Sequence, residues 1–164
     1  MSSNKHPLSH LNHVDFLYKP KLEYINKFIN NIPNIRILEL GVMHGRSTAM
    51  FLDLCDRNDG SLISIDIDDY SNLFSNKNWK FIKSRDDNFN FLSKQFKKNS
   101  FDAIYIDSLH EPNHVKKVLF FYYNYLKVNG RVFIDDINWL PFVKGSFKDS
   151  EYSEVINRKT FNKI

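Results

Sequence analysis

Residues 35–48 read IRILELGVMHGRST, and this stretch decides the fold. A short apolar run leads into a loop with two glycines, Gly41 and Gly45, and then Ser47 and Thr48 open a helix-like segment. Short apolar runs bounded by turn residues are typical of buried parallel strands. Glycines let the backbone approach a ligand closely, and a helix N-terminus offers free N–H groups. The stretch therefore predicts a strand, a loop and a helix start that together form a ligand-binding site.

The rest of the chain repeats this alternation of strand and helix patterns. Apolar residues at helical spacing predict helices over residues 21–31, 47–57, 86–98 and 111–128. Short apolar runs predict strands over residues 35–40, 61–66, 79–83, 101–107 and 131–136. Asn129 and Gly130 are expected to end the last helix, since glycine commonly follows a helix C-terminus. The alternation predicts an α/β fold, Rossmann-like and doubly wound, with a mostly parallel sheet and helices on both faces.

Length and composition fit one globular domain of 164 residues, of which 42% are hydrophobic and 26% charged. Residues 1–20 are polar and are expected to form a flexible or loosely docked arm, with the domain spanning residues 21–164. The net charge of +4 is scattered along the chain and gives no clear nucleic-acid signal. Cys55 is the single cysteine, no run is long enough to span a membrane, and no signal-peptide core is visible. A cytoplasmic location is therefore expected.

Acidic residues close three of the predicted strands. Asp66 ends the second, Asp107 the fourth, and Asp135 with Asp136 the fifth. In parallel α/β sheets, ligands bind outside the carboxyl ends of the strands. These acids and Gly41 are therefore expected to converge on one edge of the sheet, although each acid taken alone could simply cap a following helix.

The glycine loop does not fit the two commonest phosphate-binding patterns. A P-loop needs a Lys-Ser/Thr pair at longer spacing, and the dinucleotide fingerprint needs a third glycine. Glu39 can instead face an ammonium group, and Asp66 can accept both hydroxyls of a ribose. This combination points to S-adenosylmethionine, which is cationic and carries a ribose without phosphate.

Four segments taken together resemble the class I S-adenosylmethionine-dependent methyltransferases. They are ELGVMHGRST, SID, YIDSLHEPNHVKKVL and NGRVFIDDINW, in order, within residues 35–139. The likeness is greatest to the branch of macrolide-sugar and related small-molecule O-methyltransferases. The chain departs mildly in having Asp107-Ser108 where the family usually has Asp-Gly, and Asn129-Gly130 where it has Gly-Gly.

The resemblance implies a role for each matching residue. Asp66 would hold the ribose hydroxyls, and Ser84 to Asp86 would lie near the adenine. The methionine end of the cofactor would be lined by Glu39, Gly41, Val42, Gly45 and Ser47, and Asp107 would also border the cofactor.

In metal-dependent members of the family, acids after the fourth and fifth strands hold a divalent cation. The matching residues here are Asp107, Asp135 and Asp136, which suit Mg²⁺ because it prefers oxygen ligands. His110 would act with Asp107 as the catalytic pair, taking the proton of a substrate hydroxyl. The alternatives are a solvated turn at the two last acids and a surface role for His110.

The function expected from the resemblance is metal-assisted O-methylation of a hydroxyl on a sugar or other small molecule. Residues 139–164 hold at most one short helix, so the antiparallel strand pair usual at this end of the family is expected to be missing. An alternative function is a binding or assembly module that keeps the cofactor fold without catalysis. The aromatic residues 118–126 predict deep packing or a homo-oligomer interface, and no membrane partner is expected.

Overall fold

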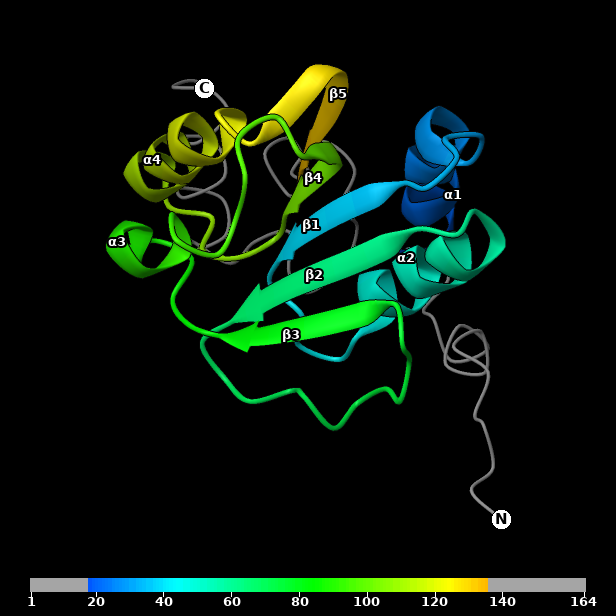
Figure 1. Ribbon diagram of the computed structural model, residues 1–164. Coiled ribbons are helices and arrows are strands. Elements are labelled where there is room, and N and C mark those ends of the chain that lie inside the picture. Colours follow the sequence, from blue (N-terminus) through cyan, green and yellow to red (C-terminus); the bar gives the residue numbers. More distant parts are fainter. Residues whose placement is uncertain (1–17, 136–164) are drawn as a thin grey trace, which may run out of the picture.

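The computed structural model describes residues 18–135, and Figure 1 shows their arrangement. Five strands form one sheet in the order β3-β2-β1-β4-β5, and every neighbouring pair is parallel. The strands are β1 (Arg36–Leu40), β2 (Ser61–Asp66), β3 (Trp79–Lys83), β4 (Phe101–Ile106) and β5 (Leu126–Ile134). The helices are α1 (Tyr18–Ile29), α2 (Arg46–Arg57), α3 (Phe89–Leu92) and α4 (Pro112–Tyr123). The predicted Rossmann-like parallel fold is confirmed.

Helices cover both faces of the sheet, with α1 and α2 on one side and α3 and α4 on the other (Figure 1). Successive residues of a strand point to opposite faces, so β1 serves two cores. Ile37 packs with α1 and α2, whereas Leu38 packs with α3 and α4, and both are fully buried. The central strands are therefore apolar on both sides, as the short apolar runs predict.

The bounds of β1 to β4 follow the prediction closely, but β5 begins at Leu126 rather than at residue 131, and two helices also differ. The helix predicted over residues 86–98 is confined to Phe89–Leu92, because Asp86 contacts His114 on α4, Asp87 accepts from Arg85 in a local loop, and turns follow Leu92. The helix predicted over residues 111–128 ends at Tyr123, so only part of the aromatic segment 118–126 is helical.

The prediction that Asn129 and Gly130 end a helix is wrong. Both residues lie inside β5, which begins at Leu126. Asn129 has a positive φ of 65°, and the pairing of β4 with β5 shifts register between Phe101 and Ala103. A residue with left-handed backbone is found both at helix ends and at some irregularities in strands. An Asn-Gly pair in the sequence is therefore compatible with either.

At the N-terminus, residues 18–20 of the predicted arm belong to α1. The remainder of that arm, Asp136 and the predicted shortened C-terminus lie outside the described residues. None of the helices within residues 18–135 has the length and apolar character needed to cross a membrane.

Candidate functional site

A cavity of about 250 Å³ opens at the carboxyl edge of the sheet, between the glycine loop and the end of β4. Its walls come from two segments more than 60 residues apart in the sequence, brought together because β1 and β4 are neighbours. The lining residues are Gly41, Val42, Met43, His44, Arg46, Ser47, Asp107, Ser108 and His110. Five residues predicted for the site are among them: Gly41, Val42, Ser47, Asp107 and His110.

Gly41 is required where the glycine loop passes β4. Its φ is +96°, and a Cβ built at this position would lie 2.0 Å from the carbonyl oxygen of Asp107. The missing side chain therefore makes room for the backbone of β4, whereas the sequence predicted that it makes room for a ligand. Gly45, with φ of +69°, begins α2, and a Cβ there would meet the ring of Phe74 at 2.8 Å.

Asp66 supports the glycine loop from the end of β2. One of its carboxylate oxygens accepts hydrogen bonds from the backbone N–H of Val42 at 2.7 Å and of Met43 at 3.3 Å. The other accepts from the N–H of Asp68 at 3.0 Å. A carboxylate has about four lone-pair sites, so Asp66 keeps acceptor capacity beyond these three bonds.

Glu39 is fully buried beneath the loop and does not line the cavity. Its carboxylate accepts hydrogen bonds from the hydroxyls of Ser47 at 2.6 Å, Thr48 at 2.8 Å and Ser64 at 2.6 Å. Burial raises the pKa of Glu39 to about 7, although the three hydroxyls oppose the shift. Glu39 therefore links β1 to β2 and to the start of α2. This structural position differs from the predicted contact with an ammonium group.

Asp107 and Asp135 lie together at the ends of β4 and β5, and we call them the acidic pair. The hydroxyl of Tyr105 is 3.1 Å from a carboxylate oxygen of each. The ring of Tyr105 is buried against Phe51, so this hydroxyl is held from within the core. Burial raises the pKa of Asp107, and the negative charge of Asp135 raises it further. The pair thus concentrates negative charge at the edge of the cavity.

His110 lies beside the acidic pair on the loop before α4. Its Nε2 is 3.5 Å from Oδ1 of Asp107, and about a quarter of its side chain is exposed. The imidazole therefore borders both the cavity and a carboxylate, which is the position a general base for a bound hydroxyl needs.

Lys21, on the second turn of α1, forms an ion pair with Asp135. The two residues are 114 positions apart, and no pattern in the sequence connects them. The Lys21 charge also acts on Asp107, where it opposes the rise in that group's pKa. A cation from the protein itself is therefore present at the acidic pair.

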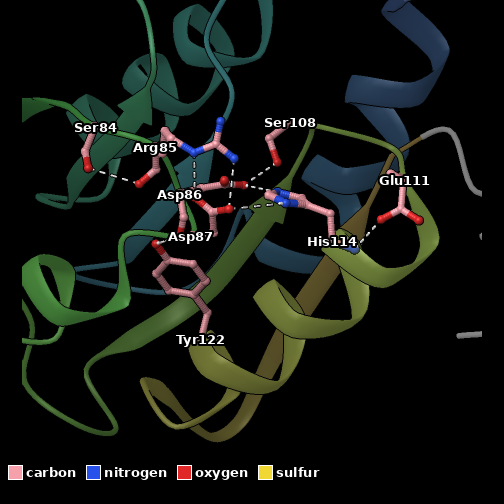
Figure 2. A network of polar contacts seen from close by, with 8 residues as sticks. All are labelled: Ser84, Arg85, Asp86, Asp87, Ser108, Glu111, His114 and Tyr122. Carbon is pink, nitrogen blue, oxygen red and sulfur yellow. Dashed lines mark hydrogen bonds and ion pairs between the residues drawn. The ribbon is translucent and has the colours of Figure 1, made fainter.

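Ser84 and Asp86, predicted to lie near the adenine, follow β3 and belong to a polar network seen in Figure 2. One carboxylate oxygen of Asp86 accepts from the hydroxyl of Ser108 at 2.5 Å and lies 3.0 Å from Nε2 of His114. Its backbone carbonyl accepts from the hydroxyl of Tyr122 at 2.9 Å. We call Asp86, Ser108, His114 and Tyr122 the Asp86 network. Ser84 bonds within its own loop, through its hydroxyl to the carbonyl of Arg85.

The network joins α4 to the loops after β3 and β4. His114 is buried, and its backbone N–H donates to Glu111, which caps the start of α4. His114 is not among the residues that the sequence predicts for the site. A signal was nevertheless present, because His114 lies at helical spacing from Val118 and Tyr122 on the buried side of the helix.

The acidic pair supplies oxygen ligands of the kind that a hard divalent cation prefers. Two carboxylates on adjacent strand ends fit such an ion, and Lys21 and His110 are groups that face them among the described residues. Within residues 18–135, however, no three His, Cys, Asp or Glu side chains gather as a metal-ligand set. The third predicted ligand, Asp136, lies outside this range.

A family model described as a methyltransferase domain matches residues 38–137, which is more than half of the chain. The chain belongs to this methyltransferase family. The resemblance drawn from the four sequence segments is therefore confirmed at the level of the family. A search of curated proteins finds no match to this chain.

Solved structures of other methyltransferases share the fold at low sequence identity. MycE of the mycinamycin biosynthetic pathway, solved with Mg, SAH and mycinamycin VI, has a TM-score of 0.65 at 21% identity, covering 93% of this chain and 45% of MycE. A Staphylococcus aureus protein described as a caffeoyl-CoA O-methyltransferase has a TM-score of 0.64 at 22% identity, covering 99% and 80%. SAH-bound PaMTH1 of Podospora anserina has a TM-score of 0.60 at 16% identity, covering 91% and 68%. The chain thus spans less than half the length of MycE.

Proposed function

We propose that this methyltransferase moves the methyl group of S-adenosylmethionine to a hydroxyl of a small molecule, such as a sugar, with the help of a divalent cation. The observation that carries the proposal is the cavity in which the glycine loop faces Asp107 and His110. MycE, which shares the fold, was solved with Mg, SAH and a macrolide. These ligands are of the classes that the proposal requires.

The glycine loop and its supports would hold the cofactor. Asp66 keeps acceptor capacity for the ribose hydroxyls, while Val42 and Ser47 border the cavity at the methionine end. Asp86 would lie near the adenine, on the loop that follows β3. Glu39 would act indirectly, by fixing the hydroxyl of Ser47 at the cavity wall.

The acidic pair and His110 would serve the acceptor. Asp107 and Asp135 would hold the divalent cation, which would supply Lewis-acid chemistry that lowers the pKa of a nearby hydroxyl, and S-adenosylmethionine would supply the methyl group on its sulfonium. His110 would take the hydroxyl proton on a ring nitrogen as the acceptor oxygen bonds to the methyl carbon and the carbon–sulfur bond breaks. Holding the reacting groups in line accounts for much of the rate in such a transfer.

Calorimetry with S-adenosylhomocysteine tests the cofactor half of the proposal. Asp66→Asn should weaken binding by about 10- to 100-fold, because a charge-assisted hydrogen bond to the ribose is lost. Asp69→Asn is the matched control, since this exposed aspartate three residues later accepts its hydrogen bonds from Ser71 within residues 18–135. Equal affinities for the two variants would contradict the assignment of Asp66.

Turnover with a panel of sugar and phenolic hydroxyl compounds, with and without EDTA, tests the other half. The proposal expects S-adenosylhomocysteine to form in the presence of Mg²⁺ and to stop with EDTA. A non-catalytic binding module would instead bind S-adenosylmethionine with the same dependence on Asp66 and release no product.

A further inference from the structure

Lys21 occupies the side of Asp135 that faces α1. Of the Lys21 side chain 29% is exposed, against 8% of Asp135, so the ion pair lies at the rim of the core rather than on the open surface. Lys21 precedes Leu22, which with Ile25 packs α1 onto the sheet. The lysine is thus delivered to the acidic pair by a helix that is anchored in the core.

The acidic pair needs a positive charge. The Tyr105 hydroxyl, which lies at 3.1 Å from each carboxylate, carries one hydrogen and cannot donate a full hydrogen bond to both. Two carboxylates close together repel each other, and removing them from water without a partner is costly. Lys21 provides positive charge at this point, since it contacts Asp135 and its charge also reaches Asp107. His110 faces Asp107 from the loop before α4, at 3.5 Å.

A divalent cation bound to the same carboxylates would meet this ammonium. The Lys21 ammonium contacts Oδ2 of Asp135. The same oxygen lies 3.1 Å from the Tyr105 hydroxyl shared with Asp107, so the ammonium stands where an ion bound by both carboxylates would lie. Like charges at contact distance repel strongly where the surroundings are partly dry. The metal and Lys21 are therefore competitors for one site.

We infer that Lys21 is the internal counter-ion of the acidic pair, and that a divalent cation binds between Asp107 and Asp135 only by displacing it. The inference rests on the metal-assisted function proposed above. It assigns to α1 a role in setting the affinity for the metal, in addition to its packing role.

The experiment measures Mn²⁺ binding to the whole chain, without S-adenosylmethionine or acceptor, from the paramagnetic resonance of free Mn²⁺. Lys21→Gln removes the charge and should tighten Mn²⁺ binding by about tenfold. Lys21→Arg keeps the charge and should bind as the unmodified protein does. Lys27→Gln is the matched control, because this exposed lysine is in the last turn of the same helix and should leave Mn²⁺ affinity unchanged.

The outcomes separate this inference from the proposed function. Mn²⁺ binding that is equal or weaker in Lys21→Gln than in the unmodified protein overturns the competition and leaves metal assistance standing. Absence of Mn²⁺ binding in all four proteins overturns both. Thermal unfolding of each variant, together with retained S-adenosylhomocysteine binding, shows that the compared proteins are folded, and Lys21→Met repeats the test with a second neutral side chain.

Discussion

The Asp86 network and the acidic pair lie at the same edge of the sheet, and they differ in how many carboxylates meet and which groups face them. Asp86 receives one hydroxyl and faces one imidazole at its carboxylate, and a further hydroxyl bonds to its backbone (Figure 2). Asp107 and Asp135 share one hydroxyl, Asp107 also faces the imidazole of His110 at 3.5 Å, and Asp135 pairs with Lys21. The first group holds a single carboxylate between two loops and a helix, while the second places two carboxylates around one hydroxyl at adjacent strand ends.

This difference separates support from chemistry. The Asp86 carboxylate joins two loops to a helix through hydrogen bonds within the protein. Two carboxylates that share one hydroxyl beside a cavity are placed to take up a cation or to act on a bound hydroxyl. Ser108 joins the two groups, because it follows Asp107 directly and donates to Asp86.

The largest effect is expected from breaking the acidic pair. Asp107→Asn should lower methyl transfer by about 10²- to 10⁴-fold, the range typical of losing a group that acts on proton transfer. The free energy of unfolding should not fall, because burial and Asp135 already disfavour the charged form of Asp107. Initial rates of S-adenosylhomocysteine formation and urea unfolding give the two measurements. A loss of stability that matches the loss of rate would mean that Asp107 belongs with the supporting group.

Glu39 sharpens the comparison, because it has donors but no cation. Its pKa is about 7 in the folded protein and 4.5 for an unperturbed glutamate side chain, so the folded state binds more protons than the unfolded chain between these values. Its contribution to stability is then fully present below pH 4.5 and is lost as the pH rises through 7. The loss approaches about 3 kcal/mol by pH 9.

The measurement is urea unfolding from pH 4 to pH 9, on the unmodified protein and on Glu39→Gln. Subtracting the two curves removes the contributions of all other groups, and the difference should carry the pH dependence described above. Parallel curves would show that Glu39 has an ordinary pKa.

A smaller effect is expected from breaking the Asp86 network. His114→Leu removes a donor from a buried carboxylate and should lower the free energy of unfolding by about 2 kcal/mol. His114→Gln keeps an N–H near the same place and should cost about half as much. Urea unfolding at pH 7 checks both values. Equal losses for the two variants would indicate that packing, rather than the bond to Asp86, is what His114 contributes.

Much of the fold could be predicted because its strands are short apolar runs with clear ends. β2 and β3 have the bounds that the sequence predicts, since Asp59 and Gly60 precede one and polar residues flank the other. The end of α4 could not be located in this way. Residues 118–126 are apolar or aromatic nearly all round, so helical periodicity gives no boundary between α4 and β5.

The site could be predicted in part for a similar reason. Gly41 and Asp107 follow strands whose ends meet wherever a parallel sheet forms, so strand order alone brings them together. Lys21 could not be selected, because its partner is 114 residues away and the contact depends on how a helix lies on the sheet. Helical spacing could indicate that His114 is buried, but it could not indicate its partner Asp86, 28 residues away. Local spacing carries no information on such contacts.

The close approach of Gly41 to Asp107 has a mechanical consequence. A Cβ at position 41 would lie 2.0 Å from the carbonyl oxygen of Asp107. A single added methyl group would therefore force the loop after β1 away from the end of β4. This close approach brings two parts of the proposed site into direct contact. One is the loop proposed to hold the methyl donor, and the other is the strand end proposed to serve the acceptor. Methyl transfer tolerates only small errors in the distance between its reacting atoms. The backbone contact between Gly41 and Asp107 helps to fix the distance between the two parts of the proposed site.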